Sequence, residues 1–495
     1  MPLAYPPDRT SSPQRSSLAV LPRRTLLLAT LGALSTGAGL LSACGSSTAS
    51  TATTVPTSHT SAAALSRNSA SAAKAAPTAG TQQSVLQGKA TGARTQVTIN
   101  YYGARTYDTV MHAVGTGFLQ VHPNVDLQLN YVTGNWKQQV ETMIAGGVPP
   151  DLFRADPVDF YSFAGLGVYE PLDPYVARDN YSFADYWPQL KEEYSWNGKL
   201  LNLPDIVNNL ILWYNVDLFQ KAGLPTPNDL AAKQQWTWDT ALQTAQKLTS
   251  GTGPTKQFGL YILNGAVNYL LPWVWMAGGS LFDNEQQPTK LTFANPKSVN
   301  ALQWLGDLGS KYGVEPQPAS LVSSNGGQLF YTGRVGMYIA QLDIEGMHSS
   351  IKGFSWDCAP LPSGSAGMWN FYGGADFGIV TAAKQHDLGW ELLKYITSPA
   401  GQASYVTHQL AIPILRSVAN ADAWLKAPYS PPHKQVILDA LTQSKPIPKT
   451  SAYTQLDSQA VEPNLADLWN GKANAQTVAA KIDQAGQPIL ASARR

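Results

Sequence analysis

The sequence predicts an α/β protein whose folded part divides into two lobes. Stretches of alternating apolar residues, typical of strands, are interleaved with stretches whose apolar residues recur every three or four positions, typical of helices. The folded part spans 95–495, about 400 residues, whereas a single hydrophobic core stops growing at about 250–300 residues. Alternating strands and helices over that length favour α/β architecture with two cores.

The first elements are expected in the order strand, helix, strand. Residues 95–102 alternate, 109–120 can form a helix, and 125–131 alternate again. A further helix over 136–145 leads to a short strand near 149–153. This order is typical of the opening of a parallel sheet.

Later helices are indicated by their start and stop signals. Asn295-Pro296 predicts the start of a helix, because proline is favoured at the first helical position. A helix over 387–397 is expected to end at Ser398-Pro399, which also caps the next helix.

The N-terminus carries the marks of an export signal. Arg23-Arg24 precedes an apolar stretch that ends in the run Leu41-Ser42-Ala43-Cys44, which resembles a bacterial lipobox. Residues 1–43 are therefore expected to be a signal peptide, with Cys44 lipidated and the chain anchored outside the cytoplasm. The alternatives are an uncleaved transmembrane anchor and, for the export route, either a twin-arginine signal or an ordinary basic region.

Residues 44–94 are expected to be a lipidated cysteine followed by a disordered linker. Serine, threonine and alanine dominate this stretch, which has too few large apolar residues to offset the entropy of chain ordering. Lipidation of Cys44 would leave Cys358 without a partner for a disulfide. Cys358 lies in a predicted strand, which favours a buried structural thiol.

The composition favours a neutral polar ligand. Removal of 1–43 takes four arginines and one aspartate from 34 basic and 33 acidic residues, so the charge is nearly balanced and gives no case for nucleic acid binding. The 14 tryptophans and 22 tyrosines offer aromatic faces for such a ligand. The seven histidines show no metal-ligand spacing, and no phosphate-binding loop or nucleophile elbow occurs, so no cofactor or metal is expected.

A series of short segments, each weak alone, occurs in an order that resembles a known family. The segments are 140–147, 150–153, 198–204, 212–224, 236–239, 245–249, 278–282, 333–338, 360–364 and 471–490. In that order the chain resembles the family 1 extracellular solute-binding proteins, the sugar-capturing components of ABC importers, similar to maltose-binding protein.

The resemblance implies a two-lobed periplasmic-binding-protein fold (type II) with a ligand cleft between the lobes. Lobe one would comprise 95–204 and 372–425, and lobe two 205–371 and 426–495. The implied protein is a monomer without enzymatic activity that hands a sugar or oligosaccharide to an ABC permease. The alternatives are a non-sugar solute, such as a peptide, a polyamine or a metal chelate, and a secreted carbohydrate-active enzyme. Such an enzyme would need two carboxylates across the bond it cleaves, for which Asp343 with Glu345 or Asp156 with Asp159 are candidates.

Sugar sites combine aromatic rings, which cover C–H faces, with planar polar side chains, which bind hydroxyls. Candidate residues are those at predicted strand ends and chain crossings: Tyr102, Arg154, Asp156, Asn208, Asn209, Trp273, Trp275, Asp343, Trp369, Tyr372, Gly374, Asp376 and Tyr453. Either tryptophan could instead fill a core, and Arg154 could form a local ion pair with Asp156. Asp343 stands where relatives often have tryptophan, which departs from the family pattern.

Overall fold

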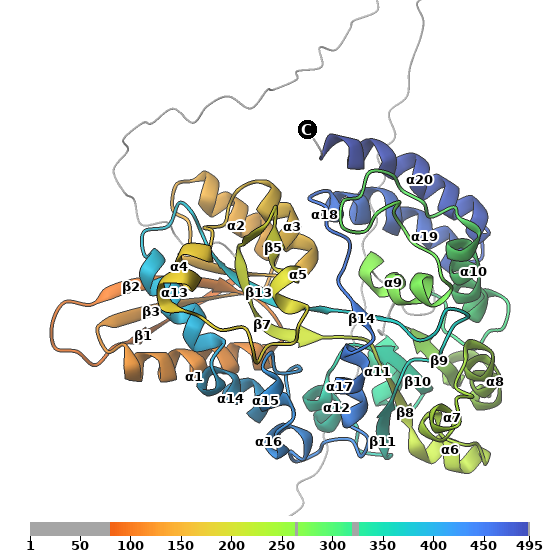
Figure 1. Ribbon diagram of the computed structural model, residues 1–495. Coiled ribbons are helices and arrows are strands. Elements are labelled where there is room, and N and C mark those ends of the chain that lie inside the picture. Colours follow the sequence, from red (N-terminus) through yellow and green to blue (C-terminus); the bar gives the residue numbers. More distant parts are fainter. Residues whose placement is uncertain (1–79, 263–265, 319–325, 494–495) are drawn as a thin grey trace, which may run out of the picture. The chain divides into compact units, whose positions relative to one another are not determined.

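The computed structural model describes residues 80–262, 266–318 and 326–493, and these residues form two principal sheets (Figure 1). The first sheet has six strands in the order β1 (Thr81–Gln87), β3 (Val125–Val132), β2 (Thr95–Tyr101), β4 (Leu152–Ala155), β13 (Gly373–Ile379) and β7 (Asn202–Asn208). Strands β3, β2 and β4 are parallel, whereas β1 and β13 run antiparallel to their neighbours. The sheet is therefore mixed, not parallel as the opening segments alone indicate.

Helices lie on both sides of the first sheet, with α2 and α3 on one side and α1 and α14 on the other (Figure 1). These and the remaining helices of this region are α1 (Arg105–Val121), α2 (Trp136–Ala145), α3 (Pro157–Gly165), α4 (Asp173–Asp179), α5 (Leu190–Glu193), α13 (His386–Ile396), α14 (Pro399–Thr407), α15 (Arg416–Ala419) and α16 (Asp422–Leu425).

The second sheet has four strands in the order β11 (Trp356–Ala359), β8 (Ile211–Asn215), β10 (Val335–Ala340) and β9 (Phe258–Ile262). Its helices are α6 (Val216–Ala222), α7 (Pro227–Ala232), α8 (Trp238–Leu248), α9 (Val267–Met276), α10 (Pro296–Ser310), α11 (Gly326–Tyr331), α12 (Ile344–Ser350), α17 (Gln435–Leu441), α18 (Tyr453–Leu456), the π-helical turn η3 (Asp457–Val461), α19 (Glu462–Trp469) and α20 (Ala475–Ser492). Smaller elements are β5 (Ser195–Trp196), β6 (Lys199–Leu200), η1 (Gly253–Thr255), β12 (Asn370–Phe371) and β14 (Ser444–Lys445).

The helix signals in the sequence are confirmed by the cap geometry. The Asn295 side chain accepts from the backbone N–H of Ser298 at the start of α10, and Ser398 accepts from Gly401 at the start of α14. In both helices proline follows the cap, where its missing N–H leaves no hydrogen bond unmade. Cys358 lies fully buried in β11, as the predicted strand required.

The chain passes between the two sheets at short crossings. The first crossing connects β7 to β8 through Asn209 and Leu210, and a second connects β12 to β13 through Tyr372. Because β7 continues to Asn208, residues 205–208 belong to the first sheet, not to lobe two as expected from sequence.

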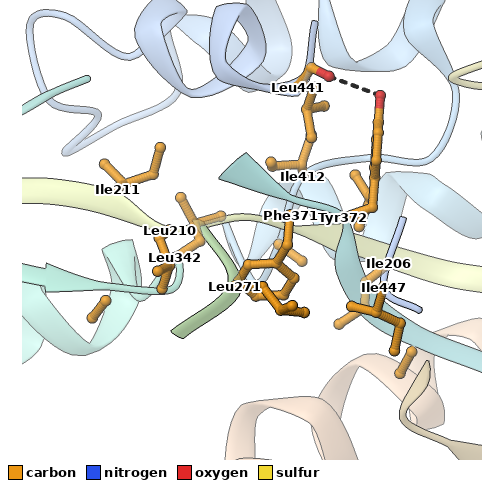
Figure 2. Close-up of a cluster of buried hydrophobic side chains, with 14 of the residues drawn as sticks. Ile206, Leu210, Ile211, Leu271, Leu342, Phe371, Tyr372, Ile412, Leu441 and Ile447 are labelled. Atoms are coloured by element: carbon orange, nitrogen blue, oxygen red, sulfur yellow. Dashed lines mark hydrogen bonds between the residues drawn. The ribbon is translucent and has the colours of Figure 1, made fainter. Parts of the chain in front are cut away.

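The crossings are held together by buried apolar side chains (Figure 2). Ile206, Leu210, Phe371 and Ile412 lie in this cluster, and the hydroxyl of Tyr372 donates to the carbonyl of Leu441 at 2.8 Å. The cluster fixes the backbone where the two halves of the chain meet.

The expected linker over 44–94 is wrong for its last part, because 81–87 form β1. This polar segment buries little side-chain surface, and Val85 remains 53 % exposed. Its order comes from the antiparallel backbone ladder with β3, which runs from Thr81 opposite Val132 to Gln87 opposite Asp126. Hydrophobic content alone could not reveal a strand stabilised in this way.

The predicted signal peptide, Cys44 and the linker up to residue 79 lie outside the described residues. Within the described ranges, no helix has the length and apolar character needed to cross a bilayer.

Candidate functional site

A cavity of about 300 Å³ lies where the crossings, β4 and α9 meet. Its lining residues are Arg154, Asp156, Pro157, Val158, Ile206, Asn208, Ala266, Asn268, Tyr269, Gln341, Phe371, Tyr372, Gly373, Gly374 and Ile447. They come from the first sheet and its helix α3, from the crossings, and from α9 and the end of β10 in the second half of the molecule. We call this space the crossing cavity.

Arg154, in β4, is fixed on one wall of the crossing cavity. Its Nε lies 3.2 Å from Oδ2 of Asp205, and its Nη1 donates to the carbonyl of Tyr102 at 3.1 Å. Its guanidinium also lies over the rings of Tyr107 and Tyr102, at 4.1 and 5.2 Å from their centroids. The partner of Arg154 is therefore Asp205 and not Asp156, which corrects the local ion pair considered from sequence.

Asp156 occupies the first position after β4, where α3 begins. Its side chain does not cap α3 and forms no ion pair within the described part of the chain, although it lines the cavity. Burial, reinforced by the carboxylates of Asp159 and Asp205, raises the pKa of Asp156 to about 6, while Arg154 and Tyr102 oppose that rise. The cavity thus contains an acceptor whose charge changes near neutral pH.

The opposite wall is uncharged. Asn268 and Tyr269 come from the first turn of α9, and Gln341 directly follows β10. The Tyr269 hydroxyl donates to Oε1 of Gln341 at 3.4 Å, and its ring meets Phe371 edge-on with centroids 6.1 Å apart. This wall offers aromatic surface and amide groups.

The crossings form the remaining surface of the cavity. Asn208 is 9 % exposed, and its amide oxygen has no protein partner in the described residues. Gly374 has a φ of +141°, and a Cβ there would lie 2.3 Å from the carbonyl oxygen of Ile206. Only glycine fits this position, because both the backbone conformation and the space exclude a side chain.

Five of the residues expected from sequence line the crossing cavity, namely Arg154, Asp156, Asn208, Tyr372 and Gly374. Their common feature is position, since all lie at the end of β4 or on the two crossings. Proximity to the cavity makes them candidates for ligand contact.

Other expected residues lie elsewhere for identifiable reasons. Trp273 is fully buried between α8 and α10, with its ring 5.8 Å from that of Trp238 and 5.3 Å from that of Trp304. Trp275 is buried and donates from Nε1 to Glu285 at 2.5 Å. Both tryptophans therefore fill a core, the alternative considered from sequence.

Three polar candidates form hydrogen bonds with residues that do not line the cavity. The side chain of Asp343 caps α12 by accepting from the N–H of Gly346 at 3.1 Å. Asn209 is fully buried and donates to the carbonyl of Ile437 at 3.0 Å. Asp376 is fully buried on β13, where it accepts from the amide of Asn202.

The remaining candidates are aromatic. Tyr102 stacks on Trp136 with centroids 4.5 Å apart and acts on two lining residues, Arg154 and Asp156. Trp369 donates to the carbonyl of Ala366 at 3.1 Å and lies against Lys445, whereas Tyr453 is buried at the start of α18. None of the three is among the residues that line the crossing cavity.

The sequence reasoning missed the uncharged wall. Gln341 lies two positions before the proposed Asp343, and Tyr269 lies four positions before Trp273 in the same helix. The two missed residues therefore lie in the same segments as residues that were proposed from the sequence. A hydrophilic residue at the end of β10 was the available signal for Gln341.

The arrangement of these groups can bind a polar molecule. Asp156 is the one carboxylate among the lining residues, whereas Asp159 is paired with Lys137 at 2.8 Å and Asp343 caps a helix. Within the described ranges, no cluster of histidine, cysteine and acidic residues could hold a metal ion.

The chain matches the model of the bacterial extracellular solute-binding protein family over residues 102–403. A binding protein of Brucella abortus is 23 % identical over 355 residues, covering 70 % of this chain and 82 % of the relative. The arabinooligosaccharide-binding protein of Bacillus subtilis is 28 % identical over 203 residues, covering 40 % of this chain and 43 % of the relative.

A solved structure with similar architecture is the ABC substrate-binding protein from Listeria monocytogenes in complex with cycloalternan. It superposes with a TM-score of 0.71 at 19 % identity, covering 80 % of this chain and 99 % of that one. This similarity confirms the two-lobed α/β fold predicted from sequence. Because the family match covers more than half of the chain, the protein belongs to the bacterial extracellular solute-binding protein family, whose members are binding proteins that act outside the cytoplasm.

Proposed function

We propose that the protein captures a sugar or oligosaccharide in the crossing cavity and delivers it to an ABC permease. The observation that carries the proposal is the composition of the cavity. It combines amides and charged groups that can bind hydroxyls with the ring of Tyr269, which can cover a C–H face. The similar protein from Bacillus subtilis, which is named for arabinooligosaccharide binding, and the similar structure from Listeria monocytogenes, which is a complex with cycloalternan, support this assignment.

Isothermal calorimetry of purified residues 45–495 with neutral and charged mono- and oligosaccharides tests the proposal. We expect one saccharide class to bind and to be recovered unchanged after incubation. A peptide or polyamine that binds while every sugar fails would replace the sugar by another solute. Cleavage of a bound sugar would favour a carbohydrate-active enzyme, for which the lone lining carboxylate Asp156 provides no partner of the kind that glycoside hydrolysis requires.

We further propose that the protein works as a monomer on the outer face of the membrane, held by lipid at Cys44. The support is the lipobox-like run that ends at Cys44, together with the extracellular family. Mass spectrometry of the N-terminal peptide from the membrane fraction tests this, with Cys44→Ser as the control. An acylated Cys44 is the expected result, and an unmodified N-terminus in the wild-type protein would contradict it.

A further inference from the structure

The charge balance around the crossing cavity points to a more specific ligand, and this inference rests on the proposed sugar-binding function. Arg154 is the one cationic residue among those that line the cavity. Its charge is matched by Asp205, which is fully buried and lies 3.2 Å away, and its two ring contacts cover the guanidinium faces. Arg154 therefore leaves no uncompensated positive charge for an anionic ligand.

Further acidic groups lie near Asp156 or Tyr269, on several elements. Asp159 lies on α3, Asp376 on β13, and Asp457 on the turn η3 that follows α18. Asp159 is neutralised by Lys137 at 2.8 Å, whereas Asp376 and Asp457 form no ion pair in the described part of the chain. Burial holds the pKa of Asp457 at about 7, and the pKa of Asp376 well above its usual range. Asp457 is therefore only partly ionised at neutral pH, so the negative charge at the lining comes mainly from Asp156, whose pKa is about 6.

The negative groups act on the cavity from both of its walls. Asp457 accepts from the N–H of Val267 at 3.1 Å, at the start of the helix that carries Tyr269. After burial, Asp156 and Asp457 are the main groups that raise the pKa of Tyr269, to about 12. Asp156 and Asp457 are thus both close enough to Tyr269 to act on its hydroxyl.

The hydrogen-bonding groups favour a ligand that donates. Asp156 is the carboxylate among the residues that line the cavity, and the amide oxygen of Asn208 has no protein partner in the described residues. A hydroxyl group both donates and accepts, whereas an ammonium group has three donors and no acceptor. An ammonium group can therefore donate to both acceptors, and its positive charge would pair with the carboxylate of Asp156.

We propose that the crossing cavity selects a saccharide that carries a protonated amino group, with Asp156 as the residue that receives the ammonium and sets specificity. Neutral sugars of the same stereochemistry bind more weakly because they leave the carboxylate without a charged partner. Acidic sugars are excluded, because they would bring a second negative charge beside Asp156.

Calorimetry of residues 45–495 with matched sugars at pH 7 and low salt tests the proposal. Glucosamine, galactosamine and mannosamine, and their β-1,4-linked or available oligosaccharides, are each compared with the hydroxyl, N-acetyl and uronic acid counterparts. We expect the amino form of at least one series to bind tenfold or more tightly than its hydroxyl counterpart, with the uronic acid weakest. That preference should shrink below about pH 6, because protonation of Asp156, whose pKa is about 6, removes the charge.

Two variants assign the effect to its residue. Asp156→Asn should bring the amino and hydroxyl sugars to within about threefold of each other while leaving the melting temperature near that of the wild type. Asp159→Asn is the matched control, because its carboxylate is already paired with Lys137 and does not line the cavity. This control should keep most of the preference.

The outcomes separate the two proposals. If neutral sugars bind as tightly as their amino counterparts in every series, the ammonium proposal is overturned and sugar binding stands. A preference that survives in Asp156→Asn overturns the role of Asp156. If no sugar of any charge binds to a folded protein, the sugar-binding function itself fails.

Discussion

The two walls of the crossing cavity differ in both charge and order. The wall from the first sheet carries Arg154, Asp156 and the crossing residue Asn208, with Arg154 only 5 % exposed and tied to three neighbours. The wall from the second half of the molecule carries Asn268, Tyr269 and Gln341, which are uncharged. One long hydrogen bond of 3.4 Å joins Tyr269 to Gln341.

This difference indicates that the two walls have different roles in ligand binding. The charged wall is preorganised, so it can orient a polar ligand without losing side-chain entropy. The uncharged wall is less constrained by its own contacts and can adjust its ring and amides to the bound molecule. Selectivity should therefore depend on the first wall, and contact area on the second.

The most damaging substitution should be Arg154→Met, which removes the cation of the charged wall. Asp205 is fully buried, and loss of its partner leaves an uncompensated charge, so we expect a loss of about 3–5 kcal/mol in the free energy of unfolding. Urea denaturation measures this loss. Arg94→Ala breaks the exposed pair with Asp126 at 2.8 Å and serves as the control, with an expected change below about 1 kcal/mol. Equal effects of the two substitutions would contradict the preorganised wall.

A buried carboxyl without a cation partner can be compared with Asp205, whose partner is Arg154. Glu193, at the end of α5, is 1 % exposed and forms no ion pair in the described ranges, and burial raises its pKa to about 8. The side chain of a glutamate in the unfolded chain has a pKa of about 4.3. Between these values the folded protein holds a proton that the unfolded chain releases, so stability should fall as pH rises through this window.

Glu193→Gln should remove this pH dependence. We expect the variant to exceed the wild type by about 1–3 kcal/mol at pH 8 and to differ little from it at pH 5. Urea denaturation at the two pH values provides the measurement. A variant that is equally destabilised at both would show that the glutamate side chain is needed for packing and not for its proton.

The crossing between the walls can be strained by adding one methyl group. Gly374→Ala places a Cβ 2.3 Å from the carbonyl oxygen of Ile206, at a φ that L residues rarely adopt. We therefore expect the free energy of unfolding to fall by about 1–3 kcal/mol. Thermal unfolding reports the change. Gly134→Ala is the matched control, because no atom lies within 4 Å of its added Cβ. Unchanged stability in Gly374→Ala would mean that the crossing relaxes freely.

The smallest effect on stability is expected for a substitution on the uncharged wall. Such a substitution should mainly change the affinity for the ligand. Tyr269→Ala removes a half-buried ring, and we expect about a tenfold loss of saccharide affinity by calorimetry with a change in stability near 1 kcal/mol. Tyr269→Phe keeps the ring and should retain most of the affinity. A full loss in Tyr269→Phe would assign the role to the hydroxyl, and no loss in Tyr269→Ala would remove this wall from the site.

Some residues that line the cavity lie in the same segments as proposed residues but were not proposed themselves. Helix α9 shows why, because Tyr269 and Trp273 are one turn apart and lie on similar faces. Periodicity gives the face of a helix but not the depth along its axis. Tyr269 lines the cavity at the first turn, whereas Trp273, one turn later, lies between α8 and α10.

Features that depend on local chain chemistry were predictable, and features that depend on distant partners were not. Asn295 and Ser398 identified helix starts because a cap needs only its own next turn. The partner of Arg154 could not be identified, since Asp205 is 51 positions away and is placed beside it by the sheet. The same reason hid β1, whose order depends on the edge of β3.

Strand β1 also determines how mechanical load enters the protein. Any tension transmitted along the chain from before Thr81 first meets the seven-residue ladder between β1 and β3. The second sheet contains no strand of this path, because β8 through β11 join the chain only after the first crossing. A pull on the N-terminal segment would therefore reach the sheet that carries the charged wall before it reaches the sheet beside the uncharged wall.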